Sequence, residues 1–288
     1  MLTLLPGTHR DNVLMALQSV HTEASSVRGA GPMPAYSRLL GYLDWSSNAV
    51  RMLHNQISVA DIDRLVLTRR HQALLDGFGH LAGSQQERVV NGLVNLELDQ
   101  RLADIKEAID TLRTQMERWN SKSTAFIVAD TSYYLEHPSK LEDIDFAAEF
   151  KRVGGRDVRV VFPMVVVDEL DSLKQHKDRR IRWRAGYTLA VLDRLLADGE
   201  HADLSKGDDE PGSPAVTVEV LYDPPGHVRL PIADDEIVSR ALAFQALVGS
   251  RVTVVTYDTA MSMRARATGL SVKKLRTDAG EGPEPTKQ

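Results

Sequence analysis

Ile127-Val128-Ala129-Asp130-Thr131-Ser132 is a short apolar run that stops at an aspartate, and similar arrangements occur three more times along the chain. The other stretches are Val165-Val166-Val167-Asp168-Glu169-Leu170-Asp171, Pro231-Ile232-Ala233-Asp234-Asp235-Glu236-Ile237 and Val254-Val255-Thr256-Tyr257-Asp258. An acid that follows a buried parallel strand points into the crevice where open α/β sheets bind ligands. We therefore expect acids from four separate segments to converge at one edge of a sheet.

Residues 122–276 alternate short apolar runs with helical patterns, which predicts an α/β fold with a parallel sheet covered by helices on both faces. Strands are expected at 125–129, 158–162 and 252–256, and helices at 146–153, 165–173, 179–196 and 235–248, with a last helix ending at Gly269. Residues 198–214 are poor in apolar side chains and are expected to form a mobile loop. Strand-like segments at 216–221 and 228–230, joined by Asp223-Pro224-Pro225-Gly226, predict a hairpin insertion near 198–230.

Residues 1–121 are predicted to form an all-α region, because long stretches lack proline and apolar residues recur at three- and four-residue steps. Helices are expected at 11–27, 34–55 and 59–77. The clearest periodic run comprises Val94, Leu98, Leu102, Ile105, Ile109, Leu112 and Met116. This spacing is typical of a coiled coil or a helical hairpin, and packing within the chain is at least as well supported as a dimer. Residues 277–288 are expected to be a disordered tail.

The composition is that of a globular protein: the chain has 288 residues, of which 42% are hydrophobic, and no cysteine. The absence of cysteine excludes a disulfide, a thiolate nucleophile and a sulfur-ligated metal site. No apolar run approaches the roughly 18 residues that a membrane span needs, and Pro6 interrupts the apolar start, so we expect a cytoplasmic protein with no membrane partner. The nine histidines show no metal-ligand spacing and are expected to be surface or core residues.

Four convergent carboxylates would repel one another, because one pair about 4 Å apart costs roughly 4 kcal/mol at an effective dielectric of 20. A cation would relieve this repulsion, and hard divalent ions, which take oxygen ligands, best serve attack on a phosphodiester. Taken singly, Asp130, Asp234 and Asp258 are favoured helix caps and Glu169 is an ordinary helical acid, so it is their recurrence that favours a site. We expect four further acids to be solvated neighbours or secondary contacts: Asp168, Asp171, Asp235 and Glu236.

The segments in this order resemble the PIN-domain ribonucleases, in particular the PIN domains found next to PhoH-type ATPases. The resemblance covers about residues 122–276 and rests on four motifs. They are Asp130-Thr131-Ser132, the run Pro163-x-x-Val166-x-x-Glu169-Leu170-Asp171-x-Leu173-Lys174, Asp234-Asp235-x-Ile237, and Val254-Val255-Thr256-x-Asp258 with Gly269 closing the next helix. The resemblance implies a PIN-like parallel sheet sandwiched by helices. The chain has no Gly-x-x-x-x-Gly-Lys-Ser/Thr run, so we expect the ATPase half to be absent.

The resemblance implies a metal-dependent endoribonuclease that cuts single-stranded or structured RNA and leaves a 5′-phosphate and a 3′-hydroxyl. Matched motif by motif, the catalytic acids that would hold Mg²⁺ or Mn²⁺ are Asp130, Glu169, Asp234 and Asp258. The polar residues next to them would be Ser132, Thr256 and Asp235. Asp235 rivals Asp234 as a ligand, and we prefer Asp234 because the family's aspartate lies three residues before an isoleucine, here Ile237.

Two basic stretches contrast with the formal net charge of −5. One lies between Lys174 and Arg184 and the other between Arg264 and Arg276. The first begins five residues after Glu169, so we predict that it contacts the RNA backbone, with a solvated helix face as the competing interpretation. The predicted contact residues are Lys174, Lys177, Arg179, Arg180 and Arg182. Trp183 is expected to be buried in a wide apolar helix face.

Two alternatives to a free-standing nuclease remain, and a third, an aspartyl phosphatase, is disfavoured. The protein could bind RNA or act as a scaffold without turnover, and the nuclease could be the toxin of a toxin–antitoxin pair. An aspartyl phosphatase would need a second aspartate two residues after Asp130, where the chain has Ser132. The helical region offers a surface for a homo-oligomer or for a protein partner.

Overall fold

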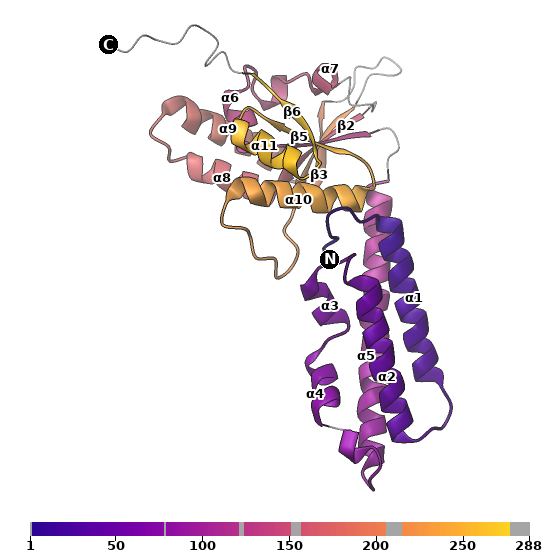
Figure 1. The fold of residues 1–288 in the computed structure, drawn as a ribbon. Helices are drawn as coiled ribbons and strands as arrows, with labels where there is room; N and C mark the ends of the chain where they lie inside the picture. The colour runs from indigo at the N-terminus through magenta and orange to yellow at the C-terminus, as the bar shows by residue number, and fades with distance from the viewer. Residues whose placement is uncertain (1, 78, 121–123, 151–156, 206–214, 277–288) are drawn as a thin grey trace. The chain divides into compact units, whose positions relative to one another are not determined.

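The structure is a computed structural model that describes residues 2–77, 79–120, 124–150, 157–205 and 215–276 (Figure 1). The chain folds into two compact units. One comprises Met1–Asn120 with Ala243–Ser250, and the other comprises Ser121–Leu242 with Arg251–Gln288. No helix among the described residues combines the length and the apolar character that crossing a membrane requires.

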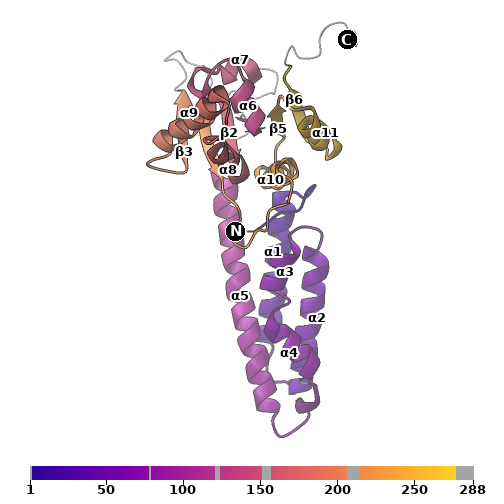
Figure 2. The same ribbon diagram turned by 90° about the vertical axis from the view of Figure 1, so that its left-hand side faces the viewer.

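The first unit is built on three long helices, α1 (Arg10–Gly29), α2 (Ala35–Leu53) and α5 (Glu87–Arg118), which pack against one another (Figure 2). The periodic run of α5 packs within the chain, since Val94, Leu98 and Ile105 are fully buried and α5 contacts both α1 and α2. The predicted all-α region is confirmed.

The segment expected as one helix over 59–77 is in fact two helices, α3 (Val59–Leu65) and α4 (Arg69–Gly77). The break follows from Thr68, whose hydroxyl accepts a hydrogen bond from the His71 amide (3.1 Å) and donates one to Glu97 (2.6 Å). A threonine that binds the backbone three residues ahead caps a new helix rather than continuing the old one.

Helix α5 buries two charged side chains that the sequence analysis did not single out. Glu97 is 1% exposed and accepts hydrogen bonds from Thr68 and from Arg70 (2.9 Å). The Arg101 Nε lies 3.1 Å from a Glu97 oxygen, and Arg101 also donates to the Arg64 carbonyl (2.6 Å). The helical unit therefore encloses an ion-pair network around Glu97.

The second unit contains a six-stranded sheet in the order β3-β4-β2-β1-β5-β6. The strands are β1 (Thr124–Ala129), β2 (Asp157–Pro163), β3 (His201–Ser205), β4 (Val216–Leu221), β5 (Val252–Thr256) and β6 (Ser271–Lys274). All neighbouring strands are parallel except β3, which pairs antiparallel with β4. The sheet is flanked by α6 (Thr131–Glu136), α7 (Phe146–Phe150), α8 (Met164–Leu173), α9 (Arg179–Leu195), α10 (Ala233–Val248) and α11 (Thr259–Ala267) (Figure 1). The predicted fold class is confirmed.

Strand β4 has a different hairpin partner from the one expected. It pairs with β3, which lies in the segment 198–214 that we expected to be a mobile loop, whereas residues 228–230 form no strand. Strand β6, absent from the prediction, follows Gly269, whose φ of +82° ends the turn after α11. Of the helix expected over 146–153, the structure describes only the part that forms α7. Residues 206–214 and the predicted tail at 277–288 lie outside the described part of the chain.

Candidate active site

Asp130 follows the central strand β1 and begins α6. Its carboxylate caps the helix by accepting a hydrogen bond from the Tyr133 amide (3.1 Å), and the residue is only 4% exposed. The hydroxyls of Thr256 (2.6 Å) and Ser132 (2.8 and 2.9 Å) also donate to it. Since Thr256 ends strand β5, these bonds connect the carboxyl ends of two neighbouring parallel strands.

Asp258 occupies the equivalent position after β5. It caps α11 by accepting a hydrogen bond from the Met261 amide (2.9 Å), and its own amide donates to the Thr256 hydroxyl (2.8 Å). The Ser132 hydroxyl completes the connection by accepting from the Tyr257 amide (3.1 Å). Both aspartates are thus helix caps, and the parallel pairing of β1 with β5 brings them to the same edge of the sheet.

Glu169 reaches this region from α8, the helix that follows β2. Its carboxylate accepts a hydrogen bond from the hydroxyl of Thr131 (2.5 Å), the residue immediately after Asp130. The sheet places β2 directly beside β1, so the element after each strand emerges at the same edge. This contact connects Glu169 to the first turn of α6.

Asp234 lies in the first turn of α10, with the Arg264 Nε 3.7 Å from its carboxylate. Its pKa is raised by partial burial and by the negative charge of Asp258, while Arg264 acts in the opposite direction. The same arginine, Arg264, forms a closer ion pair with the neighbouring Asp235. The structure thus places Asp234 within the electrostatic reach of Asp258.

Burial and mutual repulsion both raise the pKa values of Asp130 and Asp234. Burial raises the pKa of Asp130 to about 6, although the hydrogen bonds from Thr256, Ser132 and Tyr133 favour its ionised form. The charge of Asp234 raises the same pKa further. A buried, hydrogen-bonded aspartate whose pKa is raised by burial and by a neighbouring acid is typical of a functional site.

The family comparison agrees with this geometry. A PIN-domain model matches residues 127–276, which is more than half of the chain. The chain belongs to the PIN-domain family. A comparison with curated proteins finds no match. Among solved structures, one match is "a domain of a functionally unknown protein" from Methanocaldococcus jannaschii DSM 2661, with 17% identity and a TM-score of 0.33, covering 57% of this chain and 99% of that one.

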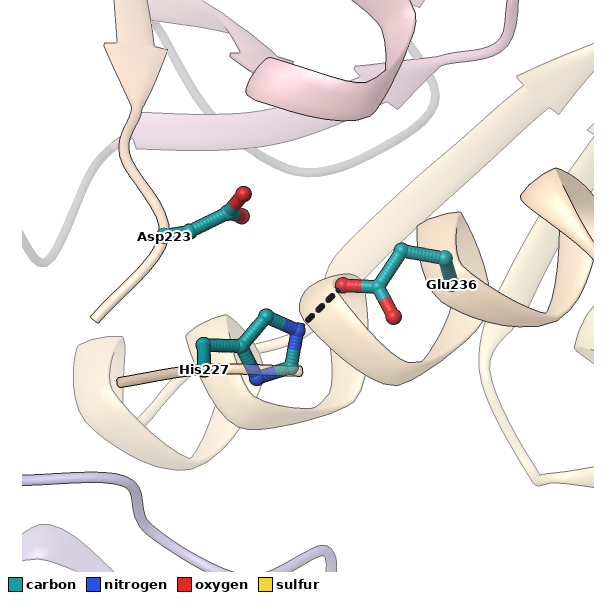
Figure 3. A group of neighbouring side chains, drawn as sticks. All are labelled: Asp223, His227 and Glu236. Atoms are coloured by element: carbon teal, nitrogen blue, oxygen red, sulfur yellow. Dashed lines mark hydrogen bonds and ion pairs between the residues drawn. The ribbon is translucent and has the colours of Figure 1, made fainter. Parts of the chain in front are cut away.

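The acids of the PIN domain form an open arrangement. Among the described residues, no three of Asp130, Glu169, Asp234 and Asp258 have carboxylate oxygens that all lie within 4.8 Å of one another. A different group meets that criterion: Asp223, His227 and Glu236 (Figure 3). Sequence reasoning missed this group, because His227 and Asp223 lie in the segment between β4 and α10 and meet Glu236 only through the fold.

In the group shown in Figure 3, both carboxylates already have cationic or hydrogen-bonding partners within the protein. The Glu236 carboxylate accepts from the Leu230 amide (2.9 Å) and pairs with His227 (2.6 Å). Asp223 pairs with Arg229 (2.7 Å) and lies 3.7 Å from Arg240. A further cation would be repelled by the two guanidinium groups, so this network serves to fix the segment that leads into α10. Of the two roles expected for Glu236, a solvated neighbour or a secondary contact, the first is wrong, since Glu236 is 0% exposed.

The basic stretch of the PIN domain begins at the end of α8 and continues into α9. Lys174 pairs with Asp171 (2.5 Å), and Arg182 donates to the His176 carbonyl (2.8 Å). All five predicted contact residues are exposed. Trp183 contradicts the prediction that it is buried, since 56% of it is exposed.

The raised pKa of Asp130 predicts how the stability of the ion-free PIN domain depends on pH. The folded carboxyl keeps its proton up to about pH 6, whereas the unfolded one loses it near 3.8. Deprotonation therefore favours unfolding, so Asp130's contribution is greatest below pH 3.8 and is lost as the pH rises to about 6. The loss should be about 2 to 3 kcal/mol.

Denaturant unfolding in chelator at pH 4 to 7 checks this expectation. The Asp130→Asn variant should lack this part of the decline, so the difference between its unfolding free energy and that of the wild type should widen with pH. Parallel curves for the two proteins would contradict the assigned pKa.

Proposed function

We propose that this protein is a metal-dependent endoribonuclease of the PhoH-associated PIN type, acting on single-stranded or structured RNA in the cytoplasm. The observation that carries the proposal is the convergence of Asp130, Asp234 and Asp258 at the carboxyl edge of a parallel sheet, where the charge of Asp234 raises the pKa of Asp130 and the charge of Asp258 raises that of Asp234. Membership of the PIN-domain family supports a nuclease rather than another use of the same acids.

The donors suit a hard divalent cation, because they are carboxylate oxygens in an open arrangement that leaves room for water ligands. Asp130, Glu169, Asp234 and Asp258 would hold one or two Mg²⁺ or Mn²⁺ ions. Such an ion lowers the pKa of a bound water and neutralises the charge that develops on the phosphate.

The protein's own groups position these acids. The hydroxyls of Ser132 and Thr256 fix both oxygens of Asp130, and the Thr131 hydroxyl orients Glu169. Arg264 pairs with Asp235 and lies near Asp234, so it offsets part of the negative charge before an ion binds. Polar neighbours that hold ligands in place in this way contribute to both metal affinity and activity.

The test is cleavage of a single-stranded RNA by the purified chain with and without Mn²⁺. We expect cleavage with Mn²⁺ that leaves 5′-phosphate ends, and loss of cleavage in excess chelator that returns when the ion is restored. Cleavage that persists in chelator would contradict the proposal, because the proposed chemistry depends on the ion to activate the attacking water. RNA retention without any cleavage would favour an RNA-binding or scaffolding protein.

We also propose that the helical unit binds a second copy of this chain or another protein. Helices α1 and α2 expose large apolar side chains such as Met15 and Leu40. An inhibitor that binds there would make the nuclease the toxin of a toxin–antitoxin pair. Sedimentation of the purified chain distinguishes a monomer from a homo-oligomer.

A further inference from the structure

Helix α9 carries a stacked pair of aromatic rings, of which Trp183 is exposed and Tyr187 is partly buried. The rings of Trp183 and Tyr187 are nearly parallel, with an interplanar angle of 16° and a centroid separation of 5.1 Å. Trp183 is 56% exposed, whereas the other two tryptophans, Trp45 and Trp119, are 2% and 3% exposed. An indole ring left in water, already stacked on one face by a tyrosine, is a rigid flat surface.

Cationic side chains border these rings. Arg179 and Arg180 precede Trp183 by four and three residues, so they lie on the same face of α9, and both are exposed. The Lys140 ammonium lies 5.2 Å from the centroid of the Tyr187 ring. Two acids are also present: Glu142 is occupied by the Tyr187 hydroxyl and by Arg194, and Asp143 lies 3.5 Å from the Lys140 ammonium at the surface. The exposed Trp183 ring and its partner Tyr187 therefore lie beside the positive charges of Arg179, Arg180 and Lys140.

The aromatic pair is held on a fixed support. Arg184 is buried and donates to the carbonyls of His137 (2.7 Å), Pro138 (2.9 Å) and Ser139 (2.7 Å). These carbonyls follow α6, the short helix that begins at Asp130, so one arginine fastens α9 to the element that carries a candidate catalytic acid. A rigid aromatic surface loses little conformational entropy when it binds a ligand.

We propose that Trp183 and Tyr187 form a stacking platform for an unpaired base of single-stranded RNA, with Arg179, Arg180 and Lys140 holding the adjacent phosphates. Exposed aromatic rings bordered by basic groups are the usual means of binding single strands without base readout. A duplex keeps its bases stacked and cannot use such a platform. The choice of RNA rests on the proposed function, and the platform names the single-stranded form as the substrate class.

The test uses the full-length Asp130→Asn chain, which should bind RNA without cutting it, and an oligouridine of twelve nucleotides. Because Trp183 is the exposed tryptophan, oligouridine should shield the intrinsic fluorescence from acrylamide quenching. Trp183→Ala should weaken binding about tenfold, within the range for stacking of one base on an aromatic side chain. Trp183→Phe should restore most of the affinity. Tyr36→Ala, which removes a 54% exposed ring on α2, should leave it unchanged.

An abasic oligomer of the same length separates stacking from charge. It should bind the Asp130→Asn protein more weakly than oligouridine does, and Trp183→Ala should not affect it further. Equal affinity for the two oligomers, or unchanged oligouridine binding by Trp183→Ala, would overturn the platform. A dimer that dissociates on Trp183→Ala substitution with RNA affinity unchanged would overturn it in favour of self-association.

The two proposals can fail separately. If the wild type cuts RNA with Mn²⁺ but Trp183→Ala binds oligouridine normally, the nuclease stands and the platform falls. If the wild type cuts nothing but Trp183→Ala loses affinity, the platform stands and the nuclease falls.

Discussion

Replacing Asp130 with asparagine should lower Mn²⁺-dependent RNA cleavage by a factor on the order of 10³, the scale seen when one principal electrostatic contact in an active site is lost. Asparagine has nearly the same shape and is itself a good helix cap, so α6 should still form. The asparagine side chain, however, lacks the negative charge that would hold a cation. The loss should therefore appear as lower activity and weaker Mn²⁺ dependence in a protein that remains folded.

Asp258→Asn should behave in the same way, because Asp258 caps α11 at the same edge of the sheet. Asp193→Asn is the matched control, since Asp193 is an exposed acid on α9 and its replacement should leave cleavage unchanged. Initial rates over a range of Mn²⁺ concentrations, with circular dichroism as a check on folding, make the measurement. Full activity in both folded site variants would exclude this acidic edge as the catalytic centre.

The largest effect on stability is expected at Glu97 in the helical unit. Replacing it with alanine leaves Arg101 buried without its carboxylate, and removing one partner of a buried ion pair costs about 3 to 5 kcal/mol. Thr68 and Arg70 would lose an acceptor as well. Glu97→Ala should therefore shift the unfolding of the α-helical signal to a much lower denaturant concentration.

Glu107→Ala provides the control, because Glu107 lies on the exposed side of the same helix. Its cost should stay within the roughly 0.5 kcal/mol typical of a surface substitution. Urea unfolding followed by circular dichroism compares the two variants. A loss below about 1 kcal/mol for Glu97→Ala would show that its buried ion pairs contribute little beyond the cost of dehydrating the charges.

Some of the site could be predicted from the sequence because parallel strands impose a simple rule. Asp130 and Asp258 each follow an apolar strand, and neighbouring parallel strands end at one edge, so their approach needed no knowledge of distant contacts. Asp223 and His227 follow no such rule. They meet Glu236 through an irregular segment whose path depends on Arg229 and Arg240, and nothing in their spacing indicates it.

The error at Trp183 has a specific cause. Helix α9 packs through a stripe that includes Arg184 and Thr188, two polar residues that are buried, together with Ala185 and Leu192. A prediction that places only apolar residues on the buried face of a helix cannot recognise this stripe. It therefore assigns Trp183 to the interior. Arg184 is buried because it donates hydrogen bonds to three backbone carbonyls after α6. These contacts join segments distant in the sequence, so the helix pattern alone does not predict them.

Strand β3 was overlooked for a related reason. It lies at the edge of the sheet, where only alternate residues are covered: Ala202 and Leu204 are partly buried, whereas His201 and Asp203 are exposed. A half-solvated edge strand carries a weak apolar signal. By contrast β1, buried almost throughout, was predicted to within one residue of its observed start.

The mutual repulsion among Asp130, Asp234 and Asp258 also bears on how long the protein would survive in a cell. A ligand that binds the folded state alone stabilises it in proportion to the logarithm of its free concentration. Metal-starved molecules would open more often and meet proteases sooner, whereas molecules supplied with manganese would be degraded slowly. The same carboxylates would then couple the abundance of the protein to the supply of the ion.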